Sequence, residues 1–223
     1  MAKPAAPKTS NIAQRRRQAQ ISGDKAYSER RKNLLKAAGE LFREKGFSST
    51  SVNDLAEKLK IDRASLYYYT SGKEELFQEM VYEAALANVL MAESVKNNSH
   101  STEEKITELV TSLIKGYETH YPYLHVYVQE DMTKIANLDT LWARKMINIS
   151  DRFDAAVVAI VQDGLDNGTI TPDSGSAKIL ASGIIGMCNW CHRWLHPKGK
   201  QSAEDIGKVY ANTLLNGMCR QTR

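Results

Sequence analysis

The chain has 223 residues, of which 42% are hydrophobic and 25% are charged, so it can bury the core of one large domain or of two smaller ones. No apolar run approaches the roughly 20 residues that cross a bilayer, and the basic N-terminus lacks the apolar segment of a secretory signal, so we expect no membrane span and no export. Three cysteines without an export signal predict a reducing, cytoplasmic setting.

Charge is unevenly distributed along the chain. Residues 1–73 hold 16 Lys and Arg against 7 Asp and Glu, a net +9, whereas residues 74–223 hold 14 against 19, a net −5. A basic front part predicts a polyanionic partner, with nucleic acid first and an anionic membrane surface second. Charge alone also fits a solvated surface that carries a basic tail.

The first element is an arm rather than a helix. Residues 1–27 contain almost no large apolar side chains and include the basic run 15–17, which predicts a flexible basic arm. A helical pattern starts at Ser28, and we expect Gly46 to end this first helix. Its apolar face is made of Leu34, Ala38, Leu41 and Phe42.

Two short helices follow. Val52, Leu55, Ala56 and Leu59 continue the apolar spacing, and Ser51 with Asp54 has capping-box spacing at the start of that helix. Residues 60–62 then form a turn before a third helix, 63–69. Ser71 and Glu74 predict a second capping box, and a long helix is expected over 73–93.

Two short helices joined by a tight turn, with a basic and aromatic second helix, are typical of a helix-turn-helix that binds DNA. Arg63, Ala64 and Ser65 open the second helix, where base edges are reached first, and Arg63 can bond a guanine edge or a phosphate. The N-terminus of the preceding helix, at Ser51, offers backbone N–H groups to a phosphate. The rival hypothesis is an amphipathic hairpin that binds a protein or a membrane, but this segment has no Trp and no single basic face.

The rest of the chain is also helical in pattern, so the predicted fold class is all-α. We expect helices over 102–121, 122–133, 139–167, 172–195 and 202–218, and we find no strand-like alternation and no repeat.

The stretch "TSVNDLAEKLKIDRASLYYYTSGKEEL" resembles the N-terminal domain of the TetR family of bacterial transcriptional regulators. The resemblance implies a DNA-binding domain over 28–74 and a ligand-binding and dimerisation domain over 75–223. It implies that Tyr67, Tyr69 and Lys73 contact phosphates, while Arg63, Ala64, Ser65 and Tyr68 face the groove of operator DNA. Two residues depart from the family pattern: Lys60 stands where the turn usually has Gly, and Thr70 stands where a Phe usually packs, so we expect Tyr68 or Tyr69 to fill that space.

The resemblance further implies a homodimer and a small-molecule pocket in the C-terminal part, and repression is the commoner mode of the family. Aromatic residues with polar tips, gathered in "GYETHYPYLHVYV", suit such a pocket, although an ordinary aromatic core would look alike. The tail "WCHRWLHPKGKQSAEDIGKVYANTLLNGM" is similar to that of TetR members that sense acyl-CoA thioesters of fatty-acid and steroid catabolism. Arg144 and Lys145 are further candidate cations for the phosphates of such a ligand. The candidate ligand residues are Tyr117, Tyr121, Tyr127, Trp142, Met146, Arg152, Trp190 and Arg193.

The stretch "CNWCH", residues 188–192, has the C-x-x-C-H spacing of covalent haem attachment, and its first four residues match a redox or metal motif. Haem attachment requires export, a zinc site requires a second ligand pair, and Cys219 is alone. We therefore expect a helix whose Cys188 and Cys191 pack in the core or at a dimer seam. The expected packed face is Ile184, Met187, Cys188, Cys191 and Leu195.

The alternative class is an all-α enzyme. The sequence contains no glycine-rich phosphate loop, no G-x-S-x-G, no H-E-x-x-H and no convincing carboxylate pair. We expect a regulator that is not an enzyme and that needs neither a cofactor nor a metal. A TetR-like regulator that answers to a different apolar or aromatic ligand is the alternative to an acyl-CoA sensor.

Overall fold

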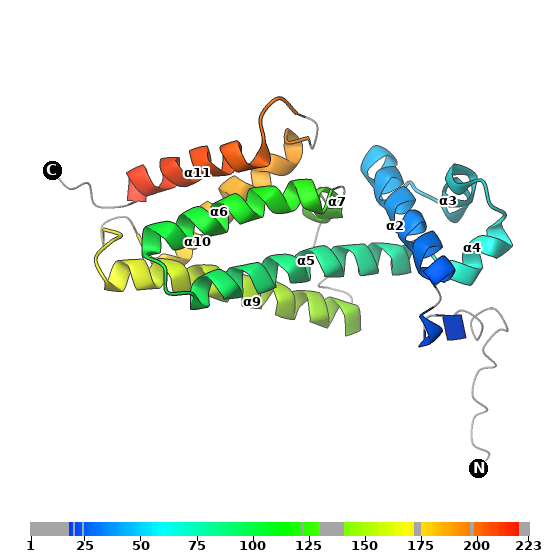
Figure 1. The fold of residues 1–223 in the computed structure, drawn as a ribbon, viewed down its shortest axis with the longest axis horizontal. Helices are drawn as coiled ribbons and strands as arrows, with labels where there is room; N and C mark the ends of the chain where they lie inside the picture. The colour runs from blue at the N-terminus through cyan, green and yellow to red at the C-terminus, as the bar shows by residue number, and fades with distance from the viewer. Residues whose placement is uncertain are drawn as a thin grey trace, which may run out of the picture. The chain divides into compact units, whose positions relative to one another are not determined.

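The computed structural model describes residues 18–19, 21–23, 25–121, 123–129, 141–171, 175–196 and 199–218. Within these ranges the secondary structure is helical and contains no β-strand, which confirms the predicted all-α class (Figure 1). The chain divides into two compact units, residues 1–80 and 81–223. One helix, α5 (Lys73–Asn97), begins in the first unit and ends in the second.

The first unit contains α2 (Lys25–Lys45), α3 (Val52–Leu59), α4 (Arg63–Tyr69) and the first two turns of α5. The predicted capping box at Ser51 is confirmed, since the side chains of Ser51 and Asp54 each bond the other residue's backbone N–H. The hydrophobic core of this unit forms because the apolar side chains of the four helices converge. Its largest buried members are Leu34, Phe42, Leu55, Leu66, Leu76, Phe77 and Met80.

The turn between α3 and α4 contains the one non-glycine residue with positive φ among the described residues. Lys60 has φ 54° and ends α3 in the left-handed conformation that its family position predicts. Its N–H donates to the carbonyl of Glu57, and Ile61 N–H donates to that of Ala56, both at 3.0 Å. These bonds satisfy carbonyls at the end of α3. Lys60 has a Cβ, so its left-handed conformation costs free energy that glycine would not incur.

The predicted arm is wrong at its C-terminal end. α2 begins at Lys25, inside the 1–27 segment, because Tyr27 gives this stretch a large ring to bury. Tyr27 is 5% exposed, and its ring centroid lies 5.7 Å from that of Tyr68 and 5.3 Å from that of Tyr69. Tyr68 and Tyr69 thus pack against Tyr27 of α2, and the small Thr70 that follows them is itself buried.

The second predicted capping box is also wrong. Ser71 donates from its backbone N–H and its hydroxyl to Glu75, at 2.9 and 2.6 Å, and not to Glu74. The helix begins two residues after Ser71, at Lys73, so the i+3 spacing that defines a capping box does not apply.

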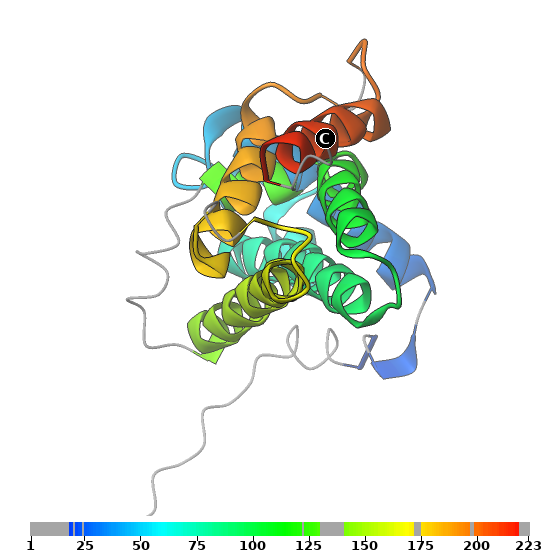
Figure 2. The same ribbon diagram turned by 90° about the vertical axis from the view of Figure 1, so that its left-hand side faces the viewer.

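The second unit contains the rest of α5 together with α6 (Thr102–Thr119), α7 (Tyr123–Gln129), α9 (Leu141–Asp166), α10 (Ala177–Asn189), the 3₁₀ turn η2 (Trp190–Arg193) and α11 (Ala203–Met218). Figure 2 views several of these helices nearly end-on, as a bundle. α11 packs along α6, and α10 along α9. The approach of α11 to α6 is close at Gly207, where a Cβ would lie 2.7 Å from the Cα of Thr111.

Several predicted boundaries in this unit are wrong. The helix expected from Pro172 begins at Ala177, because Ser176 provides an N-cap by accepting from Ile179 N–H. The same helix ends at Asn189, and the chain tightens into η2 within the CNWCH stretch. α5 runs to Asn97, four residues beyond its expected end. The predicted end of one helix at Thr133 and the predicted start of the next at Asp139 lie outside the described residues.

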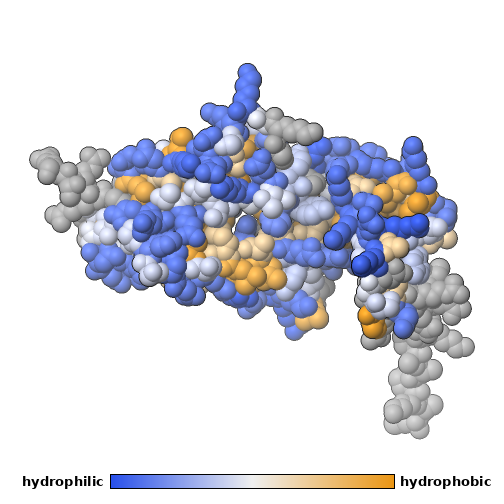
Figure 3. Space-filling view, viewed as in Figure 1, coloured by the Kyte–Doolittle hydropathy of each residue, from blue (hydrophilic) through white to orange (hydrophobic). Residues whose placement is uncertain are grey.

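The surface of the second unit is polar with apolar areas. Figure 3 shows one such area over α5 and α9. Leu90 on α5 and Ile147 on α9 are both exposed. Ile179 on α10 and Val209 on α11 are exposed as well. Among the described helices, none has the length and apolar character that a bilayer crossing requires.

Candidate nucleic-acid interface and ligand cavity

The start of α4 is held by an acidic cap. Asp62 accepts from the backbone N–H of Ser65 at 2.8 Å and from its hydroxyl at 2.6 Å. These hydrogen bonds lower the pKa of Asp62, so it stays ionised, and the negative charge suits the positive end of the helix. Ser65, a predicted base-facing residue, therefore presents a hydroxyl whose proton is already donated and whose oxygen can only accept.

Arg63 and Tyr67 form a pair on the exposed side of α4. The Arg63 Nη2 donates to the Tyr67 hydroxyl at 3.1 Å, and its guanidinium lies 5.5 Å from the ring centroid. Ala64, between Arg63 and Ser65, is exposed and small. The first turn of α4 thus offers a cation, a phenol and a short side chain together, which is the chemistry that base edges and phosphates require.

A hollow of about 430 Å³ lies beside α4 within the first unit. The rings of Tyr68 and Tyr69 line it from α4, and Arg30 lines it from α2. Arg30 is exposed, and its Nη1 lies 3.4 Å from the Tyr69 hydroxyl. Arg30 was not predicted, since nothing local in the sequence links it to Tyr69, which stands 39 residues later. The other lining residues are Asn33, Leu34, Leu59, Ile61 and Ser65.

Lys73, a predicted phosphate contact, bonds the protein backbone in the structure. Its ammonium group donates to the backbone carbonyls of Phe47, Ser48 and Thr50, at 2.8, 3.1 and 2.7 Å, and lies 4.7 Å from the Phe47 ring centroid. An ammonium group has three N–H donors, and all three are used here. In this structure Lys73 therefore fastens the loop before α3 to the start of α5, and its side chain has no donor left for a phosphate.

Ser51 stands at the N-terminus of α3, where the sequence predicts a phosphate contact. The Asp54 carboxylate accepts from Ser51 N–H at 2.8 Å and from Lys45 Nζ at 2.6 Å. The hydrogen bonds from Lys45 and from Ser51 hold the pKa of Asp54 well below its usual range. The cap anion is thus neutralised by a cation, and one first-turn N–H group of α3, that of Asp54, donates to Ser51 Oγ at 3.2 Å.

A small cavity lies inside the second unit. Its volume is about 120 Å³, and its walls come from α5, α6, α7, α9 and α10. Most of the lining is apolar, with a few polar tips, and the Tyr117 hydroxyl donates to Asn189 Oδ1 at 2.9 Å. Burial, reinforced by the charge of Asp151, raises the pKa of Asp154. The lining residues are Ala85, Asn88, Val89, Leu113, Tyr117, Leu124, Ile149, Ser150, Phe153, Asp154, Ile185 and Asn189.

The structure brings together only some of the candidate ligand residues. Tyr117 lines the cavity, whereas Met146 is buried in α9 and does not line it. Arg152 is paired in the structure, since Glu93 accepts from its Nε at 2.9 Å and from its Nη2 at 2.8 Å. Trp142 is half-buried on α9 and does not line the cavity either. The side chain of Tyr127 lies outside the described residues.

A row of aromatic and basic side chains lies next to Asn189, at the edge of the cavity. Trp190 is 58% exposed, and the guanidinium of Arg193 lies 4.9 Å from its ring centroid. His192 links this pair to His125 at 5.9 Å between ring centroids, and His125 lies 6.1 Å from Tyr121. Three of the predicted ligand residues, Tyr121, Trp190 and Arg193, therefore belong to one continuous row.

The two cysteines of CNWCH are free thiols in the described structure and are buried. Ile184, Cys188, Cys191 and Leu195 all lie in the hydrophobic core of the second unit, as predicted, and Met187 is half-buried. Burial raises the pKa of the Cys188 thiol to about 12 and also raises that of Cys191, which bonds Tyr210. Raised thiol pKa values oppose the thiolate that redox chemistry or metal binding needs.

The arrangement of α3, the turn at Lys60 and α4, with an exposed Arg63, defines a helix-turn-helix DNA-binding protein. The family profile described as "Bacterial regulatory proteins, tetR family" matches residues 34–80, and that described as "Tetracyclin repressor-like, C-terminal domain" matches residues 99–218. The chain belongs to the TetR family. Its members are DNA-binding transcription factors, so the chain is a transcriptional regulator and not an enzyme.

The chain is similar over most of its length to individual members. It is 26% identical to the HTH-type transcriptional repressor KstR2 of Mycolicibacterium smegmatis over 190 residues, which covers 85% of this chain and 90% of the relative. The solved ketosteroid transcriptional regulator KstR2 of Mycobacterium tuberculosis matches with a TM-score of 0.80, 22% identity, and coverage of 86% and 96%. AibR, solved with isovaleryl coenzyme A and operator DNA, matches with a TM-score of 0.68, 17% identity, and coverage of 83% and 98%.

Proposed function

We propose that this regulator is a homodimeric repressor that leaves its operator when an acyl-CoA thioester binds the second unit. The observation that carries the proposal is the row from Tyr121 to Arg193 beside the cavity that Tyr117 lines. AibR, solved with isovaleryl coenzyme A, supports this ligand class, and the name of KstR2, a repressor and ketosteroid regulator, supports repression.

The cavity and the row suit the two ends of such a ligand. The cavity is apolar and smaller than the roughly 300–1,000 Å³ of most ligand pockets, so it fits a short acyl group or part of a ring before neighbouring side chains move. The row offers a cation and exposed aromatic faces to a nucleotide. The residues 174–203 include no Asp or Glu, so the neighbouring sequence adds no repulsion for phosphates.

The DNA-facing surface that we propose is centred on α4. Arg63, Ala64, Ser65 and Tyr68 face base edges, and Ser51, Tyr67 and Tyr69 flank them with phosphate contacts. Arg30 joins this surface because its guanidinium lies at the Tyr69 hydroxyl and is exposed. Lys73 contributes by fixing the loop before α3. A regulator that answers to another apolar or aromatic ligand remains the alternative.

A homodimer is proposed because two α4 helices are needed to bind a palindromic operator. Exposed apolar side chains on α10 and α11, Ile179 and Val209, suit a helical interface between copies. Mass measurement in solution, with Ile179→Asp against the wild type, tests this part: one chain per particle in the wild type contradicts it.

The experiment has two stages. Bound sequences are first selected from random duplex DNA, where we expect a palindrome, and Arg63→Ala should change base preference at one position in each half-site. Acyl-CoAs of several chain lengths and ring types are then titrated against the preformed complex. Release by at least one of them supports the proposal. If the palindrome is found but none binds the free protein at micromolar concentration, the ligand class is wrong and the alternative regulator stands.

Trp190→Ala and Arg193→Ala provide the matched variants for the ligand stage. Both should weaken acyl-CoA binding and leave operator affinity unchanged without ligand, because neither lies in the first unit. Lys178→Ala, on the exposed side of α10, is the control for loss of one positive charge. Equal losses in Arg193→Ala and Lys178→Ala, with no loss in Trp190→Ala, would mean that charge alone, and not the row, attracts the ligand.

A further inference from the structure

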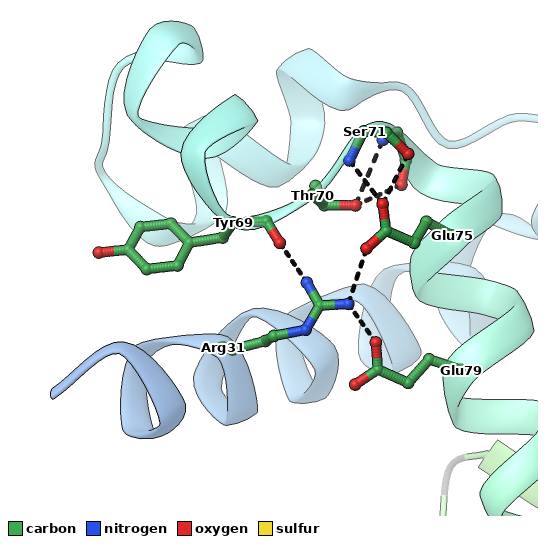
Figure 4. A network of polar contacts seen from close by, with 7 residues as sticks. Arg31, Tyr69, Thr70, Ser71, Glu75 and Glu79 are labelled. Atoms are coloured by element: carbon green, nitrogen blue, oxygen red, sulfur yellow. Dashed lines mark hydrogen bonds and ion pairs between the residues drawn. The ribbon is translucent and has the colours of Figure 1, made fainter. Parts of the chain in front are cut away.

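Arg31 is a buried arginine in the first unit. It lies on α2, is 9% exposed, and points between the end of α4 and the start of α5 (Figure 4). Its Nη1 donates to the backbone carbonyl of Tyr69, and its Nη2 donates to Glu79 and, at 3.0 Å, to Glu75. The ring of Tyr69 points away from the guanidinium, so only its backbone is held (Figure 4).

The charge of Arg31 is balanced locally. Burial alone would lower the pKa of Arg31, but the hydrogen bond to Glu79 and the charges of Glu79 and Glu75 raise it overall. A buried cation with one partner removed is costly, because its desolvation is no longer offset. The position of the guanidinium is therefore tightly determined by its three acceptors.

These acceptors belong to two different elements. Tyr69 is the last residue of α4, the recognition helix, and Glu75 and Glu79 stand one turn apart on α5. Glu75 also accepts from the backbone N–H and the hydroxyl of Ser71, which lies in the link between the two helices. A single side chain from α2 thus fixes the C-terminal end of α4 against the first turns of α5.

We propose that Arg31 is a positioning residue for sequence-specific DNA binding. Base readout depends on the placement of α4, because hydrogen bonds to base edges tolerate little displacement. Affinity for random DNA comes mainly from the general attraction of positive charge to phosphates, which depends less on the exact placement of α4. Loss of the Arg31 link should therefore reduce discrimination between operator and random DNA more than it reduces general affinity. The inference rests on the DNA-binding role of α4 and is independent of the ligand.

Three consecutive cations on α2 allow a matched test. Arg31→Gln should lower affinity for the selected operator by roughly 2- to 30-fold while affinity for random duplex changes little. Arg30→Gln should lower affinity for both DNAs by a similar factor and reduce the salt slope by about 1, as expected for a phosphate contact. Lys32→Gln should change neither, since Lys32 is exposed and stands about 200° around the helix from Arg30.

A second variant covers the case in which Arg31→Gln fails to fold. Glu79→Gln keeps the guanidinium with Glu75 and Tyr69, so circular dichroism should remain native, and the ratio of operator to random affinity should fall in the same direction by a smaller factor. Both variants are measured against selected operator and random duplex at two salt concentrations. If the folded variants leave that ratio unchanged, or lower both affinities equally, Arg31 is only a structural residue and the proposal is overturned.

Discussion

The ammonium group of Lys73 lies 2.7 Å from the backbone carbonyl of Thr50, although 23 residues separate them in the chain. This bond and its two neighbours fasten the loop that precedes α3 to the first residue of α5. The same side chain looks, from sequence, like a contact to DNA. Its position makes it a part of the scaffold that presents α3 to the operator.

The first prediction concerns Lys73→Ala. Three charge-assisted hydrogen bonds at a half-exposed site are removed, and their carbonyls can recover water, so the free energy of unfolding should fall by about 1–3 kcal/mol. Urea unfolding measures this loss. The salt dependence of DNA binding should keep its slope, because no phosphate contact is lost. If the variant is as stable as the wild type and the slope of its salt dependence falls by about 1, Lys73 contacts a phosphate directly.

The second prediction concerns Lys60, the residue at φ 54° in the turn. Lys60→Gly should raise the free energy of unfolding by up to about 1 kcal/mol, because glycine adopts the left-handed region without a Cβ conflict. The greater freedom of glycine in the unfolded chain offsets part of this gain. Lys60→Ala is the control and should bring no gain. A loss of stability in the glycine variant would show that the left-handed turn carries no strain here.

The third prediction concerns alkaline pH. Burial raises the pKa of Cys188 to about 12, whereas an unfolded thiol ionises near about pH 8.5. The folded state therefore binds the proton more tightly, and this stabilisation is complete below about pH 8.5 and is lost as the pH rises toward 12. In a Cys219→Ser background, the free energy of unfolding should fall with pH over this range.

The matched variant for that experiment is Cys188→Ala with Cys191→Ala. It should lose about 1 kcal/mol per thiol at neutral pH from the space left behind, and its decline with pH should be less steep. Some decline should remain because burial, the largest cause of the raised pKa of Tyr210, does not depend on the two thiols. Identical pH profiles with and without the two thiols would contradict the prediction. Operator affinity should not change in the variant.

The fourth prediction concerns Tyr117→Phe in the cavity. Removal of the hydroxyl leaves Asn189 Oδ1 without that donor, which should cost about 1 kcal/mol of stability. Operator affinity without ligand should be unchanged, since Tyr117 belongs to the second unit. Release by an active acyl-CoA should need more ligand, because Asn189 joins the cavity to the row at Trp190. A dose response that matches the wild type would remove Tyr117 from the ligand site.

Local patterns predicted the helices of the first unit well. The spacing of Val52, Leu55 and Leu59 and the pair Ser51 and Asp54 mark α3 because helix faces and caps are set by residues three or four apart. The link from Arg31 to Tyr69 joins residues 38 apart, so no local period contains it. It depends on how α2 packs against α4 and α5.

The ligand cavity shows the same limit. Its walls come from five helices, and Asn88, Asn189 and Asp154 are polar residues whose meeting depends on tertiary packing. An aromatic pattern identified Tyr117 and Tyr121, whereas Arg152 was selected as a cation for the phosphates of an acyl-CoA, and its partner Glu93 stands 59 residues earlier. Residues that look alike as ligand candidates in the sequence therefore end up in the cavity, in the core or in an ion pair. Which of these occurs depends on tertiary contacts that sequence spacing does not encode.

The continuity of α5 limits where the DNA-binding part of this regulator can be fused to the ligand-binding domain of another protein. Leu76, Phe77 and Met80 complete the core of the first unit, while Ala84, Ala92 and Val95 of the same helix belong to the core of the second. A hybrid joined at residue 74 would deprive the DNA-binding part of its own core and of Glu75 and Glu79. Grafting this specificity onto another sensor therefore requires a junction after Met80 that keeps the helical phase of α5 unbroken.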